Sequence, residues 1–347
     1  MAKDTETSSP VNSVSVLRIR RGQLPLIRSP RTRAIVRQLA SGIATLLVIS
    51  IVVFGFMSLR TVSEIAHQKF GNQITNEQIT AFAQSVGLDK PVWERYGIWL
   101  SHFARGDMGT SFVTNSSVSE NVIPRFEKTL LLAGLSILIS FPISVAIGVF
   151  QARRIGSATD LSLLMGSVVV AALPEFVVGI LLLFVFSREL GWLPTDSTAL
   201  VFPTSFKSEV EAYALPTATL VLAIVPYIAR IARGSLREAL TAPYTQAAVL
   251  RGLPRRTVVW DHAMRNAGVP LINAVAINIV YLLSGVIVVE NVFAFPGIGQ
   301  GLVQSIQTTD VYNVLAIAMM MGALFVIVSV VADVVAAYLN PRLKAAR

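Results

Sequence analysis

The sequence contains no cysteine and only three histidines among its 347 residues. The absence of cysteine excludes a disulfide framework and any thiolate metal site. The histidines, His67, His102 and His262, lack the spacing of metal ligands. The chain also lacks a Gly-Lys dipeptide, which a phosphate-binding P-loop requires, and it has neither a Gly-x-Ser-x-Gly nor a His-Glu-x-x-His motif. We therefore expect no catalytic residue, no metal and no cofactor in this chain.

Charged residues are scarce too, at 14% of the chain, whereas hydrophobic residues make up 53% and the mean hydropathy is +0.64. A soluble domain cannot bury so much apolar surface, so the composition predicts an all-α polytopic membrane protein. The net charge of +9 could suggest binding to nucleic acid. An unequal distribution of charge across a membrane explains it better, and we expect no nucleic-acid partner.

Six apolar stretches are long enough to cross a bilayer as helices, which takes about 20 residues. They are residues 34–59, 129–150, 161–186, 215–232, 271–289 and 314–339. They predict a six-helix transmembrane domain over residues 34–339, between a basic N-terminal tail, 1–33, and a short C-terminal tail, 340–347. The first tail has no apolar run and is not a signal peptide. Whether it binds anionic membrane lipid or only sets the topology stays open.

The basic residues predict the orientation. The tails and loops that lie inside when the N-terminus is cytoplasmic hold 20 of the 29 Lys and Arg residues but only 5 of the 20 acids. Cytoplasmic loops carry such an excess of positive charge. Both termini and the loop 234–268 are therefore predicted to be cytoplasmic, and residues 60–128 form an extracytoplasmic insertion between the first two helices.

The cytoplasmic loop has the pattern of a structured segment. Residues 238–250 are rich in helix formers, Gly252 and Pro254 interrupt them, and residues 257–267 predict a second short helix. Ala248 and Gly252 are small and four residues apart, which lets a helix approach a soluble partner closely.

This loop resembles the coupling loop of ATP-binding-cassette importer permeases, in the branch that imports dipeptides, oligopeptides and nickel. That branch has Tyr-x-x-x-Ala-x-x-x-Gly-Leu-Pro followed by His-Ala-x-Arg-Asn-Ala. The matching residues, which the resemblance assigns to ATPase coupling, are Tyr244, Gln246, Ala247, Ala248, Gly252, Leu253, Pro254, His262, Arg265 and Asn266. Gln246 replaces the glutamate of the wider family's Glu-Ala-Ala motif.

The extracytoplasmic segments also resemble this family, through its Gly-Leu-Asp-x-Pro, Gly-Asp-x-Gly-x-Ser and Pro-Gly-Ile-Gly patterns. The residues concerned are Gly87, Asp89, Pro91, Gly106, Asp107, Gly109, Ser111, Pro296, Gly297 and Gly299. Between the first two patterns, residues 92–103 predict an amphipathic helix suited to the membrane interface. The Pro-Gly-Asp-Pro that usually follows the first helix is missing at residues 60–65.

The resemblance implies a B-type subunit with six helices in the type I importer fold, working by alternating access in the bacterial cytoplasmic (inner) membrane. It also implies a homologous C-type permease, one or two ATPase chains that bind ATP and Mg, and an extracytoplasmic substrate-binding lipoprotein. Peptides are the expected cargo, with glutathione or a nickel or other metal chelate as the alternative. A secondary transporter would need ion-coupling groups and often inverted repeats, and an enzyme a catalytic constellation, and we find none.

Three polar residues in or directly next to the apolar stretches are candidates for lining a transport pathway, namely Glu175, Asn278 and Glu290. Glu175 follows Pro174 near the middle of the third stretch. Facing an ionised carboxylate to lipid there costs roughly 2.5–3.5 kcal/mol, so the side chain should face protein or water. It either attracts cationic groups of the cargo or pairs structurally with the partner permease, and the resemblance assigns it no role.

Overall fold

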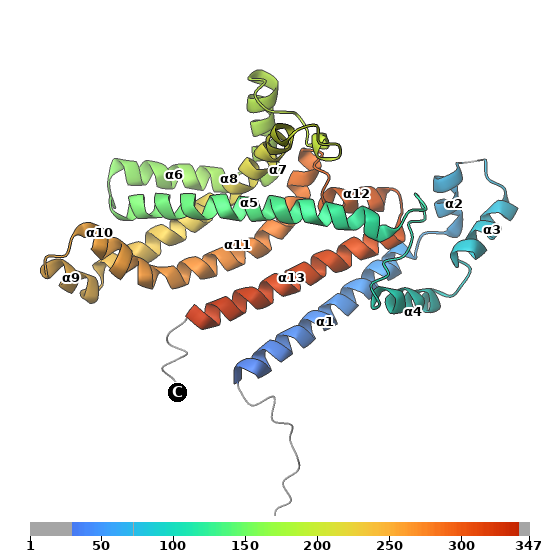
Figure 1. Cartoon of the computed structure of the whole chain (residues 1–347), viewed down its shortest axis with the longest axis horizontal. Helices are drawn as coiled ribbons and strands as arrows, with labels where there is room; N and C mark the ends of the chain where they lie inside the picture. Colours follow the sequence, from blue (N-terminus) through green and yellow to red (C-terminus); the bar gives the residue numbers. More distant parts are fainter. Residues whose placement is uncertain (1–29, 72, 340–347) are drawn as a thin grey trace, which may run out of the picture.

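The computed structural model describes residues 30–71 and 73–339, and this part of the chain is helical, with no strand longer than the single bridge between Thr110 and Ser117. The molecule is elongated, with short helices at both ends of a long bundle (Figure 1). The expected tails 1–33 and 340–347 lie outside the described residues, except that helix α1 already begins at Pro30. The all-α prediction is confirmed.

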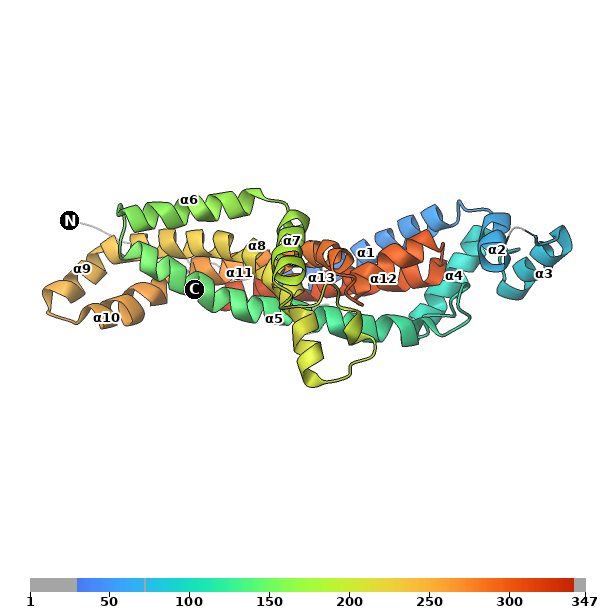
Figure 2. The same cartoon turned by 90° about the horizontal axis from the view of Figure 1, so that it is seen from above.

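Five long helices form the bundle: α1 (Pro30–Met57), α5 (Val118–Ala152), α8 (Phe206–Thr241), α11 (Met264–Val292) and α13 (Val311–Leu339). The shorter helices are α2 (Val62–Phe70), α3 (Asn76–Val86), α4 (Val92–Phe103), α6 (Ala158–Ala172), α7 (Glu175–Leu182), α9 (Pro243–Leu250), α10 (Arg255–Thr257) and α12 (Ile298–Gln307), with π-helical segments at Leu183–Glu189 and Val258–Ala263 and a 3-10 turn at Thr198–Leu200. Helices α2 to α4 lie at one end of the bundle, and α9 and α10 lie at the other (Figures 1 and 2).

The continuous third helix expected over residues 161–186 is wrong. The chain bends by 102° between α6 and α7, and α7 turns away from the bundle axis (Figure 1). Pro174 causes the break, because proline disfavours helical backbone in the residue before it. Leu173 accordingly adopts an extended conformation, with φ −80° and ψ 133°.

The bent pair still serves as one membrane crossing. Helices α5 and α8 run in the same direction: the Ser144 hydroxyl lies 3.4 Å from the Val225 carbonyl, and Gly148 lies so close to Ala232 that a Cβ on it would be 2.3 Å from the alanine Cβ. The chain between these parallel helices must therefore return to the other side. With the five helices long and apolar enough to span, this makes six crossings.

Three other expected boundaries are wrong. Helix α5 begins at Val118 rather than 129, and α8 begins at Phe206 rather than 215. The start of α8 is capped by Ser205, whose hydroxyl accepts a hydrogen bond from the Ser208 backbone. The short helix expected at 257–267 is not separate, because the π-helical segment carries the chain directly into α11. Apolar periodicity locates the membrane-embedded part of a helix but not its polar extension into water.

The amphipathic helix expected at residues 92–103 is confirmed in its bounds by α4. Two of its aromatic residues, Tyr96 and Trp99, pack against protein, whereas Trp93 is 78% exposed. Trp99 is 3% exposed, with its ring centroid 6.2 Å from that of Phe54 on α1. The hydroxyl of Tyr96 shares a hydrogen bond of 2.8 Å with the hydroxyl of Ser50, which also lies on α1. These contacts fix the α2–α4 end onto α1.

Candidate functional site

The segment expected to couple to an ATPase forms a rigid hairpin at one end of the molecule. Helix α8 ends at Thr241, and α9 starts at Pro243, which fits the first helical position because that position needs no N–H donor. The Thr245 hydroxyl donates to the Ala239 carbonyl at 2.6 Å, and the Gln246 amide donates to the Thr241 carbonyl at 3.0 Å. The residues 238–250, which are rich in helix formers, are therefore divided between the end of α8 and α9, and the two helices are joined by hydrogen bonds at the bend.

Gly252 ends α9 in the left-handed conformation, with φ +80°. Its N–H donates to the Val249 carbonyl at 2.9 Å, and the Leu253 N–H donates to the Ala248 carbonyl at 3.3 Å. These bonds satisfy carbonyls that the helix end leaves free. Pro254 then keeps the chain extended before α10, so the turn has a defined shape.

Four large apolar side chains are exposed along this hairpin. Leu250 is 88% exposed and Val249 is 56% exposed, and Tyr244 and Leu253 are also exposed on the same hairpin. We call these four residues the tip patch. Apolar side chains exposed together on a stiff element mark a protein interaction site. Val249 and Leu250 are not among the residues that the motif indicates, although two consecutive aliphatic residues in a polar, basic loop are the signal that points to them.

The other residues of the expected coupling set fall into two groups. Gln246 and Ala247 are exposed on α9, and Pro254, Arg265 and Asn266 are exposed beyond it. Ala248 is buried, at 5% exposure, where α9 packs on the π-helical segment. The expectation that Ala248 meets a partner does not fit this position, because its small side chain serves packing within the chain. His262 is half-buried in the π-helical segment.

At the opposite end, the motif that is expected to be extracytoplasmic builds turns. Gly87, Gly106 and Gly109 all have positive φ, and Gly87 ends α3 while Pro91 starts α4. Asp107 accepts a hydrogen bond from the Gly109 N–H at 2.8 Å, and its other oxygen lies 2.9 Å from His102 Nδ1. The Gly109 N–H and then His102 hold the pKa of Asp107 below its usual value. Asp89 is exposed between the two turns.

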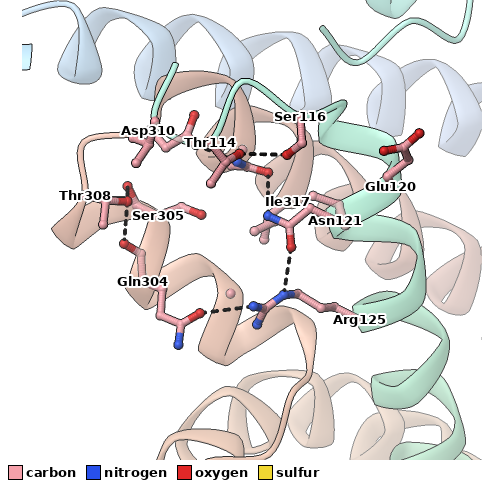
Figure 3. Close-up of a pocket in the computed structure, with 14 residues that line it drawn as sticks. Thr114, Ser116, Glu120, Asn121, Arg125, Gln304, Ser305, Thr308, Asp310 and Ile317 are labelled. Atoms are coloured by element: carbon pink, nitrogen blue, oxygen red, sulfur yellow. Dashed lines mark hydrogen bonds between the residues drawn. The ribbon is translucent and has the colours of Figure 1, made fainter. Parts of the chain in front are cut away.

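Ser111 of the same motif bonds to Asp310 at the start of α13. A polar network continues from there across a cavity of about 520 Å³ (Figure 3). Asn313 donates to Asp310 at 2.6 Å, and Arg125 donates to Asn121 at 3.1 Å and to Gln304 on α12 at 3.2 Å. The motif therefore ties the insertion to α5, α12 and α13.

Glu290 does not lie where a pathway-lining residue would. Its side chain is 0% exposed and caps the start of α12. It accepts hydrogen bonds from the Thr129 hydroxyl at 2.5 Å, the Gly299 N–H at 2.6 Å and the Gln300 N–H at 3.2 Å. The buried motif residues Pro296, Gly297 and Gly299 pass over this carboxylate. Side chains at these glycines would collide with it, which explains why the segment needs glycine.

Asn278 is also turned inward, at 7% exposure, and donates to the Ala274 carbonyl of its own helix at 2.8 Å. Glu175 differs from both, because it stays half-exposed at the start of α7. Its carboxylate interacts with Tyr281 and lies so close to Gly285 that a Cβ there would be 2.5 Å from Oε2. Of the three candidates, only Glu175 reaches a surface.

Comparison with known proteins agrees with these features. The family described as "Binding-protein-dependent transport system inner membrane component" matches residues 144–345, and the corresponding N-terminal family matches residues 31–133. The "Probable peptide ABC transporter permease protein y4tP" of Sinorhizobium fredii is 30% identical over 314 residues, covering 89% of this chain and 98% of its own length.

The "Glutathione transport system permease protein GsiC" is 31% identical in Salmonella choleraesuis and 30% identical in Escherichia coli strain K12, each over 310 residues. Each alignment covers 89% of this chain and 98% of the relative. The chain therefore belongs to the binding-protein-dependent transport system inner membrane component family, and it is a multi-pass permease component of an ABC importer.

Proposed function

We propose that this chain forms half of the pathway of an importer of di- and oligopeptides, with α9 docked on separate ATPase subunits in the cytoplasm. Those subunits bind ATP and Mg, a homologous C-type permease supplies the other half of the pathway, and an extracytoplasmic binding protein delivers the cargo. Both termini then lie in the cytoplasm. The excess of basic residues in the tails and on the α9 side supports this orientation.

The tip patch is the observation that carries the coupling role. An aliphatic side chain that is 88% exposed, as Leu250 is, gains free energy when a partner covers it. Because hydrogen bonds lock α9 to the end of α8, a push on α9 moves a helix that runs through the bundle. Alternating access needs such a rigid connection between the ATPase and the membrane helices.

The exposed stripe of α11 supports a pathway on this side of the bundle. Polar residues recur along it at helical spacing, between the exposed aliphatic residues Ile277 and Val288, whereas the surfaces of α1 and α13 expose mainly aliphatic residues such as Ile51 and Ile327. The polar members of the stripe, which are all exposed, are Asn266, Asn273, Tyr281, Ser284 and Asn291. Lipid does not favour such a face, but water or a polar cargo does.

Peptides are the cargo class that the relatives support, because one is named a peptide permease and others are named glutathione permeases. Glutathione is itself a small peptide, so it is the second candidate. The two are separated by measuring uptake of trialanine and of glutathione into proteoliposomes that hold the assembled complex with its own binding protein. Uptake of neither in an ATP-hydrolysing complex would argue against peptide import.

Substitution of Leu250 tests the coupling role. Leu250→Asp should weaken association with the ATPase subunits by tenfold or more and reduce uptake, since a charge enters a buried contact. The matched control is Phe202→Asp, because Phe202 is also strongly exposed, at 82%, but lies in the loop before α8. Both variants should fold normally, and equal loss of ATPase association in both would contradict the proposed docking.

A further inference from the structure

We propose that Glu175 and Tyr281 form an anionic subsite for a positively charged group of the cargo, such as the amino terminus of a peptide. The proposal rests on the proposed function, because it places the subsite on the stripe of α11 assigned above to the pathway. It goes further by identifying the residue that sets a charge preference there.

The break between α6 and α7 places Glu175 beside that stripe. The backbone is extended at Leu173 and bends before α7, so the carboxylate at the first residue of α7 meets α11 from the side. Gly285 makes room, since any Cβ at that position would occupy the place of the carboxylate. Tyr281 lies one turn away on α11, is 56% exposed and interacts with Glu175.

No cation within the described parts of the chain, residues 30–71 and 73–339, pairs with this carboxylate. The ion pairs there join other acids, such as Asp160 and Glu94. Glu290, an acid at the end of α11, is enclosed by three hydrogen-bond donors. Glu175 instead keeps a half-exposed carboxylate next to a polar stripe, so its charge is available to a group that arrives from outside the chain.

The absence of cysteine allows a direct test in the assembled complex. Ser284 is exposed on the stripe next to Gly285, so Ser284→Cys places one thiol beside the carboxylate. The reaction rate of this thiol is measured with two methanethiosulfonate reagents. One carries a cationic trimethylammonium-ethyl group, and the other carries an anionic sulfonatoethyl group. The cationic reagent stands in for the ammonium group of a peptide. The Glu175 carboxylate should make the thiol react faster with the cationic reagent. Glu175→Gln should lower the ratio of the cationic to the anionic rate by about tenfold, as expected for a focused local charge.

Glu189→Gln is the matched control, because Glu189 is an exposed acid at the far end of the same bent segment. It should leave the ratio unchanged. An unchanged ratio with Glu175→Gln, or a thiol that reacts with neither reagent in any nucleotide state, would overturn the subsite. The outcome is independent of the uptake measurements, which test peptide import itself, so failure of one is distinguishable from failure of the other.

Discussion

The carboxylate of Asp160 holds the guanidinium of Arg233 through two parallel hydrogen bonds of 2.7 Å each. Asp160 also accepts a bond from the Gly156 N–H at 3.1 Å, and its side chain is 3% exposed. This pair joins the start of α6 to α8 on the side of the bundle that carries α9. It therefore links the broken third apolar segment to the helix that leads directly into the hairpin of α9 and α10.

Asp160→Asn should destabilise the permease strongly. Removing one partner of a buried pair leaves the other charge uncompensated, which costs about 3–5 kcal/mol. Thermal unfolding of the purified complex measures the effect. The double variant Asp160→Asn with Arg233→Met should recover much of the loss, because no unpaired charge remains. If the double variant were no more stable than Asp160→Asn, the lost stability would come from the missing ion pair itself and not from the unpaired charge of Arg233.

Thr129→Val should loosen α12 without unfolding the bundle. The Thr129 hydroxyl donates to Glu290 and accepts from the Ile298 N–H at 2.9 Å. Valine therefore leaves the Ile298 N–H without its partner, at a cost of about 1–3 kcal/mol, and removes one of the three hydrogen bonds to Glu290. Hydrogen exchange at residues 297–301 should accelerate. Thr308→Val is the control, because Thr308 is exposed and bonds only within its own helix end. Equal exchange in the two variants would argue against the cap.

Much of the fold could be predicted because it depends on local signals. Long apolar runs locate the membrane helices, and α4 was predicted in full because its aromatic periodicity coincides with clear breaks on either side. The break before Glu175 could not be placed, since a proline in a membrane helix is compatible with a mild kink as well as with a bend of 102°. Tertiary packing decides between the two.

The site was predictable in its motif but not in its contacts. Gly252 could be identified as a helix stop, and its positive φ agrees. Nothing local to Glu290, however, indicates that Thr129 and the N–H groups of α12 enclose it, because those partners come from distant parts of the chain. The same holds for Ser111 and Asp310, which bond across 199 positions. A lone polar residue in an apolar run cannot show whether it caps a helix or lines a pathway.

The orientation is tested by single cysteines in a chain that has none of its own. Ser101→Cys on α4 and Thr204→Cys before α8 are exposed positions that should react with a membrane-impermeant maleimide added to intact cells. Arg251→Cys, exposed at the end of α9, should react only after the cells are permeabilised. Labelling of Arg251→Cys in sealed cells would place the tip patch outside and remove it from any cytoplasmic ATPase.

A graded series at Gly252 separates backbone strain from crowding in the coupling hairpin. Within the chain, no atom lies within 4 Å of a Cβ added there, so the left-handed φ of +80° is the constraint. Left-handed backbone costs a typical L-residue roughly 1–2 kcal/mol, and asparagine less. Hydrogen exchange of α9 should therefore become faster, and the coupling of ATP hydrolysis to uptake weaker, from glycine through Gly252→Asn and Gly252→Ala to Gly252→Val.

Gly234→Ala is the control, since Gly234 lies inside α8 with ordinary helical backbone and equally open space. That change should leave the permease as stable or slightly stabilise it. If Gly252→Asn and Gly252→Val were equally impaired, the contact with the partner, and not the shape of the turn, would be the reason for glycine at this position.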